Sequence, residues 1–163
     1  MSGWESGFKR GGSLRNSKPK KTRAKVKGIK QLKRDAWDAF SRMIRQRYAD
    51  PQTGEVQCVT CGAVKNWTEV HAGHFLDGRR NAVLFDERNV HPQCVKCNMF
   101  NGGAKVAYYD FMRAKYGQEV IDELKVLDKT DRKFTREELI DMKNKYTMAA
   151  GEGNDSTNDP VVF

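Results

Sequence analysis

The sequence has no apolar run that approaches the roughly 18 residues of a membrane-spanning helix. Its N-terminus also has no apolar segment of the kind found in a secretory signal peptide. We therefore expect no membrane association and a cytoplasmic location, where thiols stay reduced. Only 38% of the residues are apolar and 31% are charged, so the hydrophobic core must be small. Small cores commonly need a staple such as a bound metal.

Cysteine and histidine are scarce, and all of them lie in one stretch between residues 58 and 97. The cysteines form two Cys-x-x-Cys pairs, and all three histidines lie between the pairs. One isolated pair would also suit redox chemistry, but two pairs favour a closed, structural Zn²⁺ site with four thiolates. The spacer of 32 residues is longer than in a simple zinc ribbon, which indicates a further structure between the pairs. The predicted ligands are Cys58, Cys61, Cys94 and Cys97.

Positive charge is concentrated near the N-terminus. Residues 1–50 contain 15 Lys+Arg and 4 Asp+Glu, whereas the rest of the chain holds 15 and 17. A basic arm on a near-neutral body is typical of nucleic-acid binding, although such an arm can also be merely solubilising. We predict that residues 1–34 are disordered alone and contact phosphates. The predicted contacts are Lys18, Lys20, Lys21, Arg23, Lys25 and Lys27.

Helical periodicity predicts the scaffold. Apolar residues at three- and four-residue steps predict a helix from Asp35 to about Tyr48, and further helices are expected over about 105–116, 118–127 and 135–146. Thr135 and Glu138 match a capping box, and Gly117 fits the residue after a helix end. We assign residues 35–149 to one domain with its core at 56–116. Residues 150–163 form a flexible tail, whose apolar end is a candidate docking site for a recombination or replication protein.

The residues between the cysteine pairs predict two strands and a helix. The segment 68–75 has strand-like composition, residues 77–81 suit a polar loop, and residues 89–91 suit a second strand. A helix is expected to begin near Asn98. Because side chains alternate along a strand, positions 71 and 73 should share one face while position 74 points to the other. The expected fold class is α+β, with a zinc-stapled ββα core and surrounding helices.

The spacing of His74, Asn89 and Asn98 within this frame resembles the HNH, or ββα-metal, nuclease motif in its His-Asn-Asn variant. The segments 72–75 and 85–98 resemble more narrowly the NinG (Rap) recombination endonucleases of lambdoid phages. The resemblance is dense from Cys58 to Tyr109. It implies a phage protein in a bacterial host that hydrolyses phosphodiester bonds and leaves 5′-phosphate and 3′-hydroxyl ends.

The resemblance also implies roles for the three motif residues. His74 would be the general base, since an imidazole with an ordinary pKa of about 6.5 is largely neutral at pH 7. Asn89 would hold the base, with a carbonyl on the second strand accepting the Nδ1 proton. Asn98 would be an oxygen ligand of a catalytic Mg²⁺ or Mn²⁺ ion.

One position departs from the family pattern. Many relatives carry an aspartate immediately before the catalytic histidine, whereas this chain has Gly73, which has no side chain to ligate a metal. We predict that His71, on the same strand face, replaces it and favours Mn²⁺ or other transition ions. Asp77 and Asp86 remain alternative ligands. His91 suits a structural role in the hairpin.

The resulting hypothesis is a metal-dependent DNA endonuclease that acts on branched recombination intermediates such as Holliday junctions or D-loops. A C2 homodimer would suit the two-fold character of a junction. Arg79, Arg80 and Arg88 are candidate phosphate contacts, or alternatively part of a solvated loop. Two other functions stay open: an HNH nicking or homing-type endonuclease on plain duplex DNA, and a zinc-ribbon protein that binds nucleic acid without cutting it.

Overall fold

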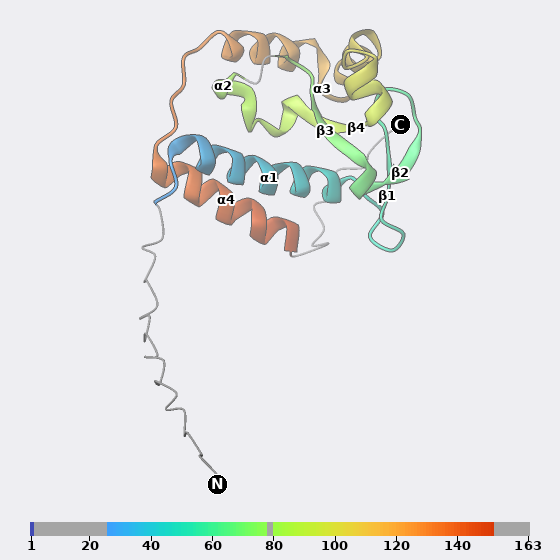
Figure 1. Cartoon of the computed structure of the whole chain (residues 1–163). Helices are drawn as coiled ribbons and strands as arrows, with labels where there is room; N and C mark the ends of the chain where they lie inside the picture. The colour runs from blue at the N-terminus through green and yellow to red at the C-terminus, as the bar shows by residue number, and fades with distance from the viewer. Residues whose placement is uncertain (2–25, 78–79, 152–163) are drawn as a thin grey trace.

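The computed structural model describes residue 1, residues 26–77 and residues 80–151. Most of the predicted basic arm, Arg79 and residues 152–163 therefore lie outside the described residues. Two long helices, one long kinked helix, two small sheets and several short helical turns make up the described chain (Figure 1). Within it, no helix is both long and apolar enough to cross a membrane. This mixture of helices and small antiparallel sheets agrees with the expected α+β class.

Helix α1, Ile29–Arg47, is the longest uninterrupted helix. It begins six residues earlier than the sequence analysis placed it, so residues 29–34 are helical and do not belong to a disordered arm. Leu32 explains the difference, because its side chain is buried in the main hydrophobic cluster and extends the apolar stripe by one turn. The surrounding lysines gave this segment the composition of a tail.

Two separate hairpins carry the cysteine pairs. Strands β1, Glu55–Gln57, and β2, Val64–Asn66, pair antiparallel and enclose the first pair. Strands β3, Val70–His74, and β4, Val90–Cys94, form the second antiparallel sheet. The second hairpin confirms the two predicted strands, whereas the first was not predicted from the sequence.

Strand β4 leads directly into a short π-helical turn, η3, Lys96–Phe100, which is followed by α3, Lys105–Asp128. Asn98 therefore lies inside η3 and does not begin a helix. The loop between β3 and β4 contains α2, Asn81–Leu84, and the 3₁₀ turn η2, Glu87–Asn89. A further 3₁₀ turn, η1, Trp67–Glu69, precedes β3.

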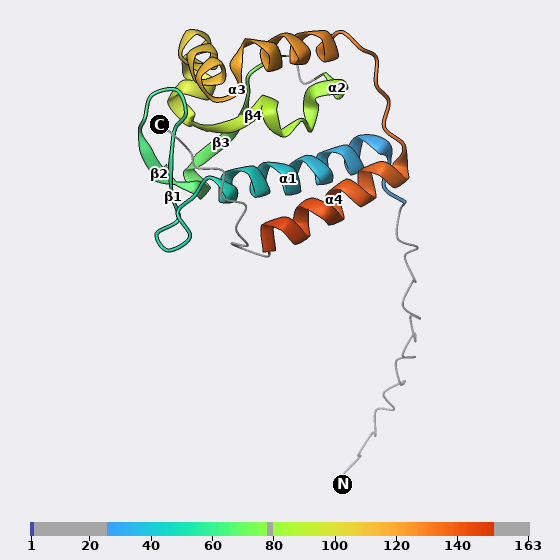
Figure 2. The same cartoon turned by 180° about the vertical axis from the view of Figure 1, so that it is seen from behind.

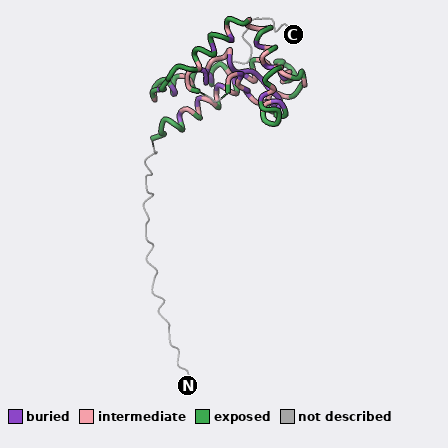
Figure 3. The backbone as a smooth tube through the Cα atoms, turned by 90° about the horizontal axis from the view of Figure 1, so that it is seen from above, coloured by how far each residue is buried: buried purple, intermediate pink, exposed green. Residues whose placement is uncertain are grey.

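The β3–β4 hairpin lies between two helical layers. Helices α1 and α4, Arg136–Gly151, run side by side under one face, as both views show (Figures 1 and 2). Ala72 and Val90 point to that face and share a hydrophobic cluster with Phe40 of α1. On the other face, Tyr108 of α3 donates a hydrogen bond to the Gly73 carbonyl. The buried positions form the centre of the molecule, and the outer helix faces are exposed (Figure 3).

The capping signals in the C-terminal half are confirmed. The Thr135 hydroxyl accepts from the Glu138 backbone N–H at 3.1 Å, and the Glu138 carboxylate accepts from the Thr135 N–H at 2.8 Å. These two bonds start α4. Gly117 has φ 80° and ψ 171° and breaks α3 into two helices at the predicted place.

We predict that Gly117→Ala destabilises the protein by about 1–3 kcal/mol, because only glycine adopts this backbone conformation without strain. A Cβ at this position would meet nothing within 4 Å, so the cost is conformational and not steric. Urea unfolding measures it. Gly28→Ala is the comparison: that glycine, at the N-cap of α1, has φ −74° and equally open surroundings, so alanine there carries no penalty for a positive φ and should cost less than Gly117→Ala. Equal stability of the two variants would contradict the prediction.

Candidate functional site

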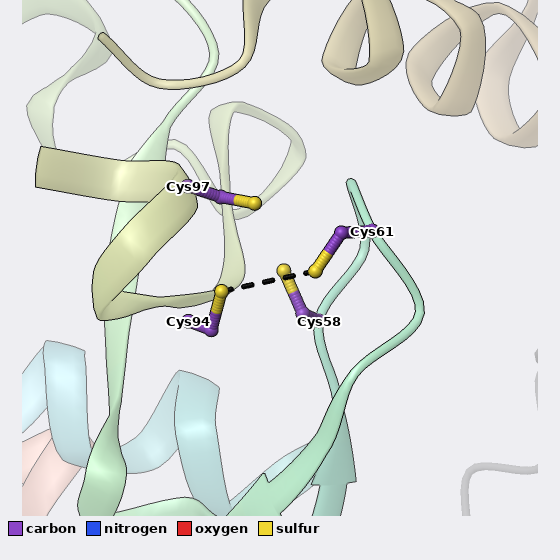
Figure 4. A group of neighbouring side chains, drawn as sticks. All are labelled: Cys58, Cys61, Cys94 and Cys97. Carbon is purple, nitrogen blue, oxygen red and sulfur yellow. Dashed lines mark hydrogen bonds between the residues drawn. The ribbon is translucent and has the colours of Figure 1, made fainter. Parts of the chain in front are cut away.

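The four cysteines converge at one point although they come from different elements. Cys58 and Cys61 lie in the β1–β2 turn, Cys94 ends β4, and Cys97 lies in η3 (Figure 4). All four sulfurs lie within 4.8 Å of one another, and the Cys61 and Cys94 sulfurs are 3.8 Å apart. A tetrahedral Zn²⁺ with Zn–S distances of about 2.3 Å requires sulfur separations of about 3.8 Å. The cluster therefore fits a structural zinc ion.

The electrostatics of the cluster also call for a cation. Burial opposes ionisation of Cys58, but hydrogen bonds from the Thr60 hydroxyl and from backbone N–H groups outweigh it and lower the thiol pKa to about 6. At Cys61 the Ala63 backbone favours the thiolate. Burial and the neighbouring sulfurs nevertheless raise the pKa of Cys61 to about 12. Four thiolates can share this volume only when a dication neutralises them.

We predict that Cys97→Ser removes bound zinc and a large part of the thermal stability, since structural zinc sites contribute about 10–16 kcal/mol of apparent binding free energy. Metal content measured by inductively coupled plasma mass spectrometry should fall from one zinc per chain towards zero. Val95→Ser changes an exposed residue between the two cysteines and should retain the metal. Unchanged zinc content in Cys97→Ser would exclude this cysteine as a ligand.

The ring of His74 is held from two sides. Its Nε2 atom lies 3.2 Å from the Leu84 carbonyl oxygen, and its ring stacks on Trp37 of α1 with centroids 4.8 Å apart. Because a carbonyl can only accept, Nε2 carries the proton and Nδ1 carries the lone pair. A carbonyl on the second strand was predicted to accept a hydrogen bond from Nδ1 of His74. In the structure the accepting carbonyl is that of Leu84 in α2, and the nitrogen that donates to it is Nε2.

Asn89 organises the loop between β3 and β4 through bonds to Leu76, Val83 and Phe75. Its buried amide accepts from the Leu76 N–H at 2.9 Å and donates to the Val83 carbonyl at 3.2 Å. The Asn89 backbone carbonyl accepts from the Phe75 N–H. Asn89 thus bonds to residues at the start and in the middle of the loop. The same loop contains α2, whose Leu84 carbonyl orients His74.

His71 and Asn98 are brought together as expected. The Nδ2 atom of Asn98 lies 3.0 Å from Nδ1 of His71. The Asn98 Oδ1 atom lies 3.0 Å from the position that a Cβ on Gly73 would occupy. Beside it, the Oε1 atom of fully buried Gln93 has no hydrogen-bond partner among the described residues. Two amide oxygens therefore face the backbone of Gly73.

His74 and Asn98 are not brought together. Position 74 points towards α1, where its ring meets Trp37, whereas positions 71 and 73 point towards η3 and Asn98. The alternation of side chains along β3 causes this separation. The expectation that all three motif residues surround one ion does not match this arrangement, because His74 and Asn98 lie on opposite faces of the hairpin.

His91 has the structural role that the sequence suggested. It is fully buried, and its ring nitrogens lie 3.0 Å from the hydroxyls of Tyr108 and Tyr116. The Tyr108 hydroxyl donates to Gly73, so His91 Nδ1 donates to Tyr108 and Nε2 accepts from Tyr116. Burial, and next the charge of Lys115, lower the pKa of His91 to about 3. The imidazole is therefore neutral and links the hairpin to α3.

Several other predicted residues already have partners. Arg88 pairs with Asp86 and Glu123 at 2.9 Å, which raises its pKa. Arg80 donates to the Asp128 carbonyl at 3.3 Å. Of the alternative metal ligands, Asp77 pairs with Lys105 and Asp86 with Arg88. Lys27, the described residue of the predicted basic cluster, pairs with Asp35 at 2.5 Å.

Sequence reasoning missed two residues of the site. Trp37 was assigned only to an apolar stripe, and nothing in its spacing indicated that it would stack on His74. Gln93 was not singled out. A long polar side chain within a strand, directly before a predicted zinc ligand, could have indicated a buried role.

The fold and the cysteine cluster define an α+β protein that can hold a zinc ion and that has a histidine- and amide-rich hairpin. A family model described as "Bacteriophage Lambda NinG protein" matches residues 9–152. The chain therefore belongs to the NinG family of phage proteins.

Individual relatives agree with this assignment. The chain is 32% identical over 132 residues to "Protein ninG" of Escherichia phage 933W, which covers 77% of this chain and 62% of the relative. It is 31% identical over 127 residues to that of Salmonella phage P22, covering 77% and 59%. The match to Escherichia phage lambda is 32% over 114 residues, covering 69% and 52%. The chain thus spans about three fifths or less of these relatives. No solved structure gave a significant match.

Proposed function

We propose that this NinG-family protein is a metal-dependent DNA endonuclease with a ββα-metal (HNH) core formed by β3, β4 and the helical segments that follow. The observation that carries the proposal is the orientation of the His74 ring. The Leu84 carbonyl fixes the tautomer, and Trp37 fixes the plane of the ring. A histidine held in one tautomer on a rigid strand is suited to accept a proton in general base catalysis.

In the proposed reaction, His74 Nδ1 accepts a proton from the water whose oxygen attacks phosphorus, and the bond to the 3′ oxygen breaks. The products are a 5′-phosphate and a 3′-hydroxyl. Asn89 supports this step indirectly, because it ties down the loop that carries the Leu84 carbonyl. A bound Mg²⁺ or Mn²⁺ would supply neutralisation of the charge that develops on the leaving oxygen. The Asn98 side chain, held by His71, and the neighbouring Gln93 oxygen provide neutral oxygen ligands that suit such an ion.

The proposed substrate is branched DNA in phage recombination, in the cytoplasm of the bacterial host. The basic N-terminal segment is proposed to supply general affinity for phosphates. A C2 homodimer would place two sites on the two strands of a junction. Cleavage of a four-way junction and of a linear duplex with the same sequence separates this substrate from that of a nicking or homing-type enzyme.

A second function is favoured by one observation. Since His74 and Asn98 lie on opposite faces of the hairpin, a phosphate must reach both faces near residues 73–74 for the nuclease to work. A zinc-ribbon protein that binds DNA without cleaving it has no such requirement.

We predict that His74→Ala lowers the rate of DNA cleavage by about 10²- to 10⁴-fold and leaves DNA affinity unchanged, because the general base is lost while the basic segment proposed to bind phosphates is not changed. Single-turnover cleavage of labelled branched DNA with Mn²⁺, together with a filter-binding assay, measures both quantities. His74→Gln is the matched variant, since its amide can still donate to the Leu84 carbonyl but cannot act as a base. Wild-type cleavage by either variant would exclude His74 as the base, and absence of cleavage by the wild type would favour the binding protein.

We also predict that deletion of residues 1–25, which contain eight Lys+Arg, weakens DNA binding and reduces its salt dependence. Each lost phosphate contact should lower the slope of log K against log salt by about 0.9 on duplex DNA. Fluorescence anisotropy at several salt concentrations measures the slope. Deletion of residues 152–163 is the control, because this segment contains no Lys or Arg and should leave the slope unchanged. An unchanged slope after the N-terminal deletion would show that the arm is not a phosphate contact.

A further inference from the structure

We infer that the Gln93 side-chain oxygen is a ligand of a divalent cation, together with Asn98 Oδ1, and that the missing side chain at Gly73 is what lets the Gln93 oxygen lie beside Asn98. The inference deepens the proposed function, because this ion would be the one used by the nuclease. It assigns a direct role to a residue outside the His-Asn-Asn motif and changes the role of His71 from ligand to positioning residue.

The orientation of the Gln93 amide is determined by its neighbours. Its Nε2 atom donates to the Gly103 carbonyl at 2.8 Å and to the Thr60 hydroxyl at 3.3 Å. Because the Gly103 carbonyl can only accept, the amide cannot be turned around without losing this bond. The atom left without a partner is therefore an oxygen, and it is fully buried. A buried acceptor without a partner costs about 1–3 kcal/mol, which a bound cation would offset.

Gly73 explains how this oxygen and Asn98 can serve one ion. A Cβ added to Gly73 would overlap Gln93 Oε1 and lie 3.0 Å from Asn98 Oδ1. Both oxygens thus lie close to Gly73, on the side where its side chain would be. Mg²⁺ and Mn²⁺ bind oxygens at about 2.0–2.2 Å and keep several waters when the protein offers only one or two ligands. Two amide oxygens and water fit that pattern.

His71 acts on this site through Asn98. The Nδ2 atom of Asn98 can only donate, so the contact of 3.0 Å makes His71 Nδ1 the acceptor. Holding the nitrogen end of the amide directs its oxygen towards Gly73. The lone pair of His71 Nδ1 is used in this bond, which makes the histidine a positioning residue.

The neutral ligand set predicts weak binding by the wild type and a gain when charge is added. We expect Asn98→Asp and Gln93→Glu to bind Mn²⁺ at least about tenfold more tightly than the wild type, because a carboxylate attracts the ion more strongly. Electron paramagnetic resonance of free Mn²⁺ in titrations of the zinc-loaded full chain measures affinity without any cleavage assay. Mn²⁺ does not displace zinc from thiolates. Asn101→Asp, which adds the same charge at an exposed position of the turn after η3, is the matched control.

Two further variants test the oxygen of Gln93 itself. Gln93→Met and Gln93→Glu both lose the amide donor to Gly103, so a difference in Mn²⁺ affinity between them reports the oxygen ligand. Mn²⁺ should also raise the melting temperature of Gln93→Glu and not that of Gln93→Met. Gly73→Ala adds a Cβ that would overlap the Gln93 oxygen, and it should bind Mn²⁺ no more tightly than Gln93→Met.

Equal affinity of Gln93→Glu, Gln93→Met and Asn101→Asp would overturn the inference, and so would tighter binding by Asn101→Asp alone. If either glutamine variant fails to fold, Asn98→Asp alone tests the site. A tenfold gain in Mn²⁺ affinity that is abolished when Gly73→Ala is added supports the site, and the lack of that gain overturns it. Failure of the proposed function gives a different result: the Mn²⁺ affinities of the variants would differ as expected, but the wild type would not cleave branched DNA.

Discussion

The cluster of four thiols is the constraint on which the site depends. It joins the turn between β1 and β2 to the end of β4 and to η3, and the Val59 N–H donates to the Pro92 carbonyl across the same junction at 3.1 Å. Thr60 lies within this clamp and contacts both the Cys58 sulfur at 3.3 Å and the Gln93 amide at 3.3 Å. The zinc site is therefore connected through one hydroxyl to the space beside Gly73. The cysteine cluster and the candidate cation site therefore share a hydrogen-bonded contact at Thr60.

The β3–β4 hairpin divides its histidines between two environments. His74 faces α1, where an aromatic ring and a carbonyl orient it, while His71 faces the amide of Asn98. His91 also points away from α1, but two tyrosine hydroxyls bury it and use both nitrogens. Identical side chains thus have three roles, because burial and partner chemistry differ between neighbouring strand positions.

Much of the architecture could be predicted from local signals. The cysteine spacing predicted the cluster, the Thr135–Glu138 box predicted the start of α4, and Gly117 predicted the break in α3. These signals act over a few residues and depend little on context. The start of α1 could not be predicted in the same way, because burial of Leu32 depends on the packing of α1 against α4, which lies more than one hundred residues later in the sequence.

The sequence by itself determined the cluster of four cysteines that can hold zinc, the family, and the pairing of two strands between the two cysteine pairs, since each follows from residue type and spacing. Only the tertiary structure decided which side chains meet. It placed Trp37 against His74, gave Arg88 two carboxylate partners, and left the Gln93 oxygen beside Gly73 with no donor among the residues that the structure describes. The reason is physical: strand alternation and long-range packing set the direction of each side chain, and neither is contained in the spacing of a motif.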